Sequence, residues 1–321
     1  MILGFIFSIV ISILFALYAV PRKFSSQNVI LYTMWMGVAY CTITIIAISV
    51  LWGFGLEPLE NLFNPWHFLT VLRAFVWVLG MFAYNVAIDK IGLTRFNQWK
   101  NIQGPVGSLL ILFFVSENVA GIKIFWLFLG ITVMFLSALL FQVRSPAETM
   151  SPKKIDVSAN TRWGIAFAIF SGICFGISAM LNSVVSNTTI VGEKFTFSQL
   201  IYHSVSLTIF SVAIYLIVGN RESKPTSIKE RLKDCFIVDK KTWLPIIAGG
   251  MYMIATLLTI YSYRLIPNNA IPWSITQLNV FWTLIIGLFI FKEIDFKQNW
   301  QRLVCGTLLA ILSCIALFFA I

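Results

Sequence analysis

Long apolar stretches alternate with short polar connections along the whole chain. A helix needs about 20 apolar residues to cross the hydrocarbon core of a bilayer. The stretches that meet this length run over residues 2–20, 29–53, 68–88, 94–115, 121–143, 163–185, 197–219, 243–264, 270–291 and 301–320. We therefore predict an all-α integral membrane protein with ten transmembrane helices.

The fourth of these helices carries an unusual run of polar residues, "RFNQWKNIQGP" (95–105). Asn97, Lys100, Asn101 and Gly104 recur at three- and four-residue spacing, so they share one side of the helix. A cation inside the bilayer costs about 2.5–3.5 kcal/mol on insertion scales, and such residues usually face a water-filled cavity. Hydrogen bonds between helices, at about 0.6 kcal/mol each, are the alternative explanation for any single polar residue. The cluster as a whole predicts a cavity.

The chain contains an internal repeat. Residues 4–20 laid over 164–180, an offset of 160, match at six of 17 positions. "LLILFFVSE" (109–117) overlays "IIGLFIFKE" (285–293) at an offset of 176, and Glu117 falls on Glu293. Each half then holds five helices, and an odd number makes the halves insert in opposite senses. This plan of inverted repeats is common in secondary transporters.

The repeat defines three segments and a counterpart for the polar run. We expect a first five-helix repeat over 1–143, a cytoplasmic linker over 144–162 and a second repeat over 163–321. At the offset of 176, "NQWKNIQ" (97–103) faces "WSITQLN" (273–279). Substrate sites of such proteins lie near the membrane midplane, where corresponding helices meet. The two clusters are therefore expected to flank one site.

Composition and charge agree with a membrane protein and set its orientation. The chain is 59% hydrophobic and 11% charged, with a mean hydropathy of +0.87. Its net charge of +10 fits anionic lipid as a partner better than nucleic acid. The odd-numbered loops hold 17 Lys and Arg residues and the even-numbered loops at most three. The positive-inside rule then places the odd loops in the cytoplasm and both termini outside a plasma membrane.

The sequence contains few of the residue patterns that an enzyme would need. The five cysteines and two histidines match no metal or disulfide spacing, and no catalytic or phosphate-binding motif is present. We therefore expect no catalytic residues, no metal and no cofactor. His203 is the mid-helix candidate for proton coupling, although a lone histidine in a span is more often simply hydrogen-bonded. The sequence leaves open a monomer or a homodimer.

Three further segments carry a family resemblance. They are "FALYAVPRKFSS" (15–26), "LRAFVWVLGMFAYNVAIDKIGLTRFNQ" (72–98) and "AGGMYMIATLLTIYSYRLIP" (248–267). With the paired five-helix halves, they resemble the drug/metabolite transporter superfamily over essentially the whole chain, and its glucose/ribose/rhamnose uptake branch in particular. The resemblance implies a secondary transporter that moves a small polar solute, most simply a sugar, by alternating access.

A sugar site needs flat aromatic faces for the ring and amide or hydroxyl groups for its hydroxyls. The residues expected to supply these groups are Asn97, Trp99, Asn101, Trp273, Thr276 and Gln277, together with Lys100 and, as further walls, Trp77 and Tyr252. "NQWKN" departs from the smaller, less charged residues expected there in bacterial sugar carriers. Lys100 and Arg73 have no mid-span carboxylate to neutralise them. The alternative is therefore an exchanger of organic anions or sugar phosphates that uses these two cations.

Overall fold

The computed structural model is helical, with no strand among the residues that it describes. These residues are 2–53, 62–115, 122–140, 159–191, 196–219, most of 227–292, and 296–320. The helices are α1 (Ile2–Leu17), α2 (Val20–Phe24), α3 (Val29–Gly53), α4 (His67–Ile91), α5 (Leu93–Lys100), α6 (Gln103–Phe114), α7 (Ile122–Leu140), α9 (Ala159–Ser186), α10 (Thr188–Val191), α11 (Thr196–Val218), α13 (Trp243–Leu265), α14 (Ala270–Thr276), α15 (Asn279–Phe289) and α16 (Phe296–Phe319). Glu117, Glu293 and linker residues 144–158 lie outside the described residues.

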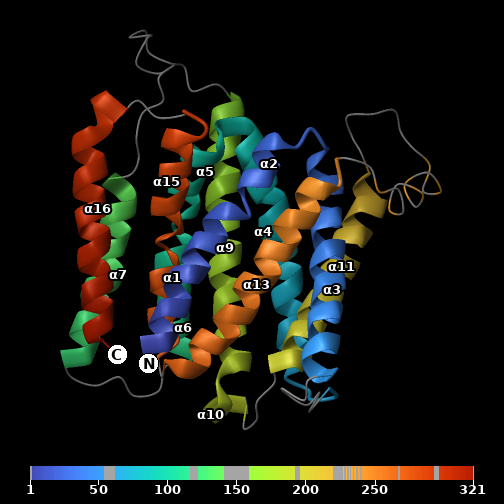
Figure 1. Cartoon of the computed structure of the whole chain (residues 1–321), viewed down its shortest axis with the longest axis horizontal. Helices are drawn as coiled ribbons and strands as arrows, with labels where there is room; N and C mark the ends of the chain where they lie inside the picture. The colour runs from blue at the N-terminus through green and yellow to red at the C-terminus, as the bar shows by residue number, and fades with distance from the viewer. Residues whose placement is uncertain are drawn as a thin grey trace.

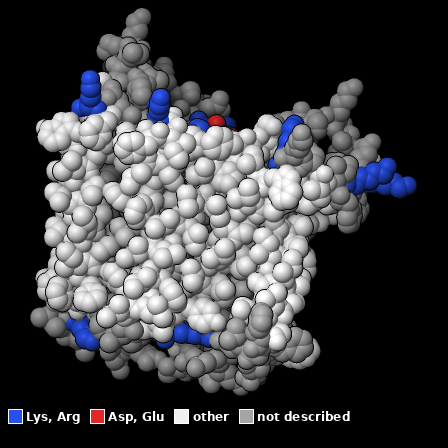
Figure 2. Space-filling view, viewed as in Figure 1, with Lys and Arg blue, Asp and Glu red and all other residues white. Residues whose placement is uncertain are grey.

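The protein is a multi-pass helical membrane protein. Within the described residues, nine segments are long and apolar enough to cross a bilayer: Ile2–Phe24, Val29–Leu51, His67–Ile91, Lys123–Leu140, Thr161–Ser186, Phe197–Val218, Trp243–Leu265, Ala270–Phe289 and Phe296–Phe319. They confirm nine of the ten predicted spans. Figure 2 shows the matching surface, a broad uncharged belt with Lys and Arg gathered at its two edges.

The stretch predicted as the remaining span, 94–115, contains two short helices, α5 and α6, separated by Asn101 and Ile102. Its apolar part, α6, is too short to count as a span by itself. Pro105 explains the interruption, because proline has no N–H and its ring clashes with the carbonyl four residues earlier. That carbonyl belongs to Asn101, and it accepts a tighter bond from the Gly104 N–H at 3.0 Å instead.

The second interrupted helix is α14–α15, where side chains compete with the backbone. Thr276 Oγ1 donates to the Trp273 carbonyl at 2.6 Å, and Gln277 Nε2 donates to it at 3.0 Å. The backbone N–H of Gln277 instead bonds the Ser274 carbonyl, three residues back. Such side-chain bonds are a known alternative to the helical ladder. The helix breaks at Gln277 and Leu278, 176 positions after the break in α5–α6.

The helices pack in corresponding pairs. α4 packs on α9 and α1 packs on α13, while α3 packs on α11 and α7 on α16. In Figure 1, α1 begins near the N-terminal label at the lower edge and leads to α2 at the upper edge. α9 runs the opposite way and ends at α10 on the lower edge, where the C-terminus also lies.

Two glycines allow the interrupted helices to approach their neighbours closely. A Cβ on Gly172 of α9 would lie 2.5 Å from the Lys100 carbonyl oxygen at the end of α5. A Cβ on Gly107 of α6 would lie 2.1 Å from Nε1 of Trp273. Small residues at helix crossings are the usual means of close packing in membranes. These glycines therefore fix how both breaks sit in the bundle.

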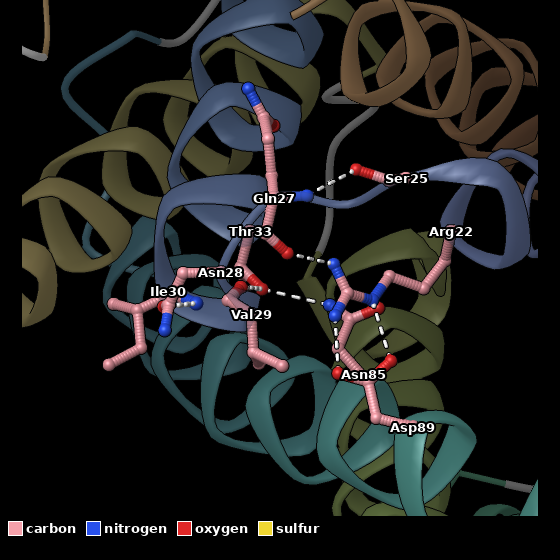
Figure 3. Close-up of polar contacts among 9 residues, drawn as sticks. All are labelled: Arg22, Ser25, Gln27, Asn28, Val29, Ile30, Thr33, Asn85 and Asp89. Atoms are coloured by element: carbon pink, nitrogen blue, oxygen red, sulfur yellow. Dashed lines mark hydrogen bonds and ion pairs between the residues drawn. The ribbon is translucent and has the colours of Figure 1, made fainter. Parts of the chain in front are cut away.

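A polar cluster joins three helices near the upper edge of the bundle (Figure 3). Arg22 of α2 forms an ion pair with Asp89 of α4, and its Nη1 donates to the Gln27 carbonyl at 2.7 Å. Asn85 Nδ2 donates to Thr33 Oγ1 at 2.8 Å and ties α4 to α3. The side chain of Arg22 is only 4% exposed and that of Asp89 is 45% exposed. The cluster thus anchors a nearly buried cation between α2 and α4.

Gly172→Ala is expected to lower the stability of the folded protein, because the new methyl group meets backbone rather than a movable side chain. Overpacking of this kind costs about 1–3 kcal/mol. The apparent melting temperature of the detergent-purified protein measures the loss. Gly53→Ala is the matched control, since no atom lies within 4 Å of its added Cβ. Equal melting temperatures for both variants would contradict the close approach at Gly172.

Candidate functional site

A cavity lies at the centre of the bundle and is lined by α1, α4, α5, α6, α9, α13 and α14. The lining residues are Phe15, Tyr18, Arg73, Trp77, Lys100, Gln103, Phe175, Ser178, Ala179, Asn182, Tyr252, Thr256, Thr259, Tyr263 and Trp273. About 50 Å³ of this space is open to the centres of water molecules, which is room for roughly three to five waters. A larger solute would require the surrounding helices or side chains to move.

An aromatic wall forms one side of the cavity. Trp77 of α4 and Tyr252 of α13 stack with ring centroids 4.4 Å apart and an interplanar angle of 29°. Tyr18 lies beside them, with its centroid 5.8 Å from that of Tyr252. Phe15 also stacks on Tyr252, with ring centroids 6.2 Å apart and an interplanar angle of 27°. Rings held by one another in this way present a rigid apolar face to whatever occupies the cavity.

Polar groups from α9 and α13 complete the lining, and sequence reasoning predicted only Tyr252 among them. Tyr252, Thr256, Thr259 and Tyr263 recur at spacings of four, three and four residues, so they share one face of α13. Asn182 of α9 lines the cavity while its Oδ1 accepts a bond from Gln199 Nε2 at 2.8 Å. The three- and four-residue spacing on α13 is the signal that could have identified this stripe.

Lys100 is buried at 2% exposure and enclosed by aromatic rings. Its Nζ lies 5.6 Å from the ring centroid of Tyr84 and 5.9 Å from those of Phe96 and Phe175. Cation–π attraction reaches about 2 kcal/mol when the pair is desolvated. Lys100 also occupies the last turn of α5, where the helix dipole favours a positive charge. The lysine is therefore stabilised, although no described carboxylate forms an ion pair with it.

Arg73 is the second buried cation of the cavity, at 5% exposure. It lies in the second turn of α4, near the positive end of the helix dipole, which does not stabilise a cation. Its guanidinium contacts the side chain of Tyr252 and lies within electrostatic range of Tyr40 and Tyr263. Its Nε and Nη1 have no hydrogen-bond partner among the described residues.

The other predicted site residues lie at or near the helix breaks and outside the cavity lining. Asn101 and Gln277 border a separate, smaller space whose other walls come from α7, α15 and α16. The hydroxyl of Thr276 donates to the Trp273 carbonyl of its own helix. Asn97 is buried, and Trp99 is half-buried against the main apolar core. The structure thus brings together Trp77, Tyr252, Trp273, Lys100 and Arg73, but not these five residues.

His203 of α11 lies behind the aromatic wall and is fully buried. Its ring centroid is 5.6 Å from that of Tyr40, 6.4 Å from that of Tyr252 and 6.5 Å from that of Trp77. Neither ring nitrogen has a hydrogen-bond partner among the described residues. Arg73 lies within electrostatic range, so a positive charge on the imidazole would be opposed by the guanidinium.

Comparison with solved structures identifies the same fold elsewhere. One structure, described only as "Crystal structure of protein", superposes with a TM-score of 0.63 at 12% sequence identity. The match covers 98% of this chain and 94% of that chain, so the architecture is shared over its full extent. No curated protein matches the chain.

A family comparison concerns the second half of the chain. Residues 226–320 match the family model described as "Sugar transport protein". This range contains most of α13 to α16, and with them Tyr252, Tyr263 and Trp273 of the cavity. The C-terminal region of the chain is thus similar to the sugar transport protein family, in agreement with the resemblance that the sequence carries.

Proposed function

We propose that the protein is a secondary transporter that carries a sugar or related carbohydrate across the membrane by alternating access. The observation that carries this proposal is the central cavity, where an aromatic wall faces hydroxyl and amide groups from several helices. Aromatic faces suit the C–H surface of a sugar ring, and hydroxyls and amides suit its oxygens. The family of the C-terminal region points to the same substrate class and argues against an enzyme.

Ten spans in two inverted five-helix repeats are part of the proposal, with α5–α6 as the tenth crossing. Three observations support it. The two helix breaks are related by 176 positions, the offset of the sequence repeat. α1 and α9 run in opposite directions (Figure 1). The helix packing also fits a two-fold relation between the halves. The third span of each half packs on the first span of the other half, as α4 does on α9 and α13 does on α1. The repeats would occupy 1–143 and 163–321, joined by the linker 144–162.

Within this scheme, Trp77, Tyr252 and Trp273 contact the sugar ring, and Lys100 and Arg73 provide hydrogen-bond donors. Asn97, Trp99, Asn101, Thr276 and Gln277 form or surround the two breaks, so their role is to shape the site. The narrowness of the cavity supports a cycle in which the helices separate to admit the substrate. Half-helices that meet at the membrane midplane are a common hinge and binding element in such carriers.

The edge that carries α2 faces the cytoplasm in this proposal, and both termini lie outside a plasma membrane. The excess of basic residues in the odd-numbered loops supports this orientation. The Arg22–Asp89 pair would then close the cytoplasmic end of the bundle. His203 is a weaker proposal for proton coupling, because Arg73 opposes a charge on its ring.

Exchange of an organic anion or sugar phosphate is a second candidate, supported by the two cations in the cavity lining. An exchanger returns only when loaded, so internal substrate should accelerate uptake of labelled external substrate. A carrier that returns empty would take up the same substrate into vesicles that contain none. Uptake into empty proteoliposomes therefore separates the two cycles.

Trp77→Leu and Tyr252→Leu are each expected to weaken binding of the transported sugar about tenfold, because each removes one ring of the stacked pair in the aromatic wall. Titration calorimetry on the purified protein measures the change. Trp163→Leu is the control, since Trp163 is 62% exposed and does not line the cavity. Wild-type affinity in both wall variants, with unchanged melting temperatures, would remove the aromatic wall from the binding site.

Cysteine labelling tests the orientation. After replacement of the five native cysteines, a membrane-impermeant maleimide is expected to label Lys123→Cys in intact cells, because the even loops face outwards. Lys241→Cys is expected to react only once the membrane is opened. Both side chains are exposed in the structure. The reverse pattern would invert the proposed orientation and leave the fold unaffected.

A further inference from the structure

Arg73 is a buried cation with no carboxylate partner among the residues that the structure describes. The ion pair found in the described part of the chain is Arg22–Asp89, so no described carboxylate pairs with Arg73. Two of its three guanidinium nitrogens lack a hydrogen-bond partner among the described residues. A buried, unpaired charge is strongly unfavourable, and inside a membrane such residues usually serve a substrate or ion.

Lys100 provides the contrast within the same cavity. Three aromatic rings surround its Nζ, and the C-terminal dipole of α5 favours its charge. The same two sources of stabilisation are weaker at Arg73, which lies in the second turn of α4. The cation–π contacts among the described residues involve Arg22, Lys23 and Lys100 but not Arg73. Of the two cations, Arg73 is therefore the one that would gain more from an anionic partner.

The position of Arg73 joins this need to the aromatic wall. Trp77 lies one turn further along α4, and Tyr252, on which Trp77 stacks, also contacts the guanidinium. A ligand with its ring against Trp77 and Tyr252 would thus present an attached group to Arg73. A small inorganic anion would satisfy the arginine but leave the aromatic face unused.

Resting on the proposed sugar-carrier function, we propose that the substrate is an acidic sugar whose carboxylate or phosphate binds Arg73 while its ring lies against Trp77 and Tyr252. Arg73 is then the residue that sets the preference for acidic over neutral sugars. Charge-assisted bonds from arginine to carboxylate or phosphate are about twice as strong as neutral ones, which gives the site its discrimination.

Three ligands that share one pyranose ring test the proposal on the purified full-length protein: glucose, glucuronate and glucose 6-phosphate. They differ only at carbon 6, so the ratio of their dissociation constants isolates the acidic group. At constant pH and ionic strength, we expect at least one acid to bind about tenfold to hundredfold tighter than glucose. Whichever of glucuronate and glucose 6-phosphate binds more tightly shows whether the site recognises the carboxylate or the phosphate.

Substitutions then assign the preference to Arg73. Arg73→Gln is expected to bring the acid and glucose to within about threefold of each other, and Arg73→Lys to keep part of the preference because it retains the charge. Lys100→Gln is expected to retain most of the ratio. Arg302→Gln, the same substitution at an exposed site on α16, controls for a general effect of net charge. The wild-type ratio remains decisive if Arg73→Gln fails to fold.

Two outcomes separate this inference from the function on which it rests. Binding of glucose as tightly as both acids, or an acid preference that survives Arg73→Gln, would overturn the role of Arg73 and leave a sugar carrier in place. Failure of all three sugars to bind would contradict the proposed sugar-carrier function itself.

Discussion

Two interrupted helices that cross at their breaks hold the centre of this protein together. Gln103 Nε2 of α6 donates to Gln277 Oε1 at 3.0 Å, and Trp273 Nε1 donates to the Gln103 carbonyl at 3.3 Å. Ser108 and Ser274 meet at 2.7 Å a turn away. Because hydrocarbon offers no hydrogen bonds, an open helix end is tolerated at this depth only where protein satisfies it. Each break therefore depends on the other for its stability.

This constraint explains why one polar cluster serves two purposes. Side chains at the breaks, such as Gln277, form hydrogen bonds with the polar groups that the interruptions leave without helical partners. Lys100 reaches the central cavity, and Trp273 both lines this cavity and bonds across the crossing. Breaking a helix inside the membrane thus creates both a need for internal hydrogen bonds and a place where polar groups meet a solute.

The sequence predicted the membrane spans well, because hydropathy over 20 residues is a strong signal. It predicted one helix over 94–115, whereas the structure breaks this stretch between α5 and α6, where polar residues and Pro105 coincide. It did not predict that Thr276 and Gln277 would bond their own helix, because periodicity identifies a face and not the partner of each group. Asn182 was missed for a related reason: a single amide in an apolar helix gives no periodic signal.

The positive charge buried at Arg73 has a consequence for the electrical behaviour of the molecule. If the helices around it shift during a transport cycle, that charge moves relative to the membrane potential. An elementary charge that crosses the whole field exchanges about 2.3 kcal/mol per 100 mV, and a partial displacement exchanges a proportionate share. A bound anion would neutralise the moving charge, so voltage would act chiefly on the empty carrier. The resting potential of the cell would then set how fast the empty carrier resets.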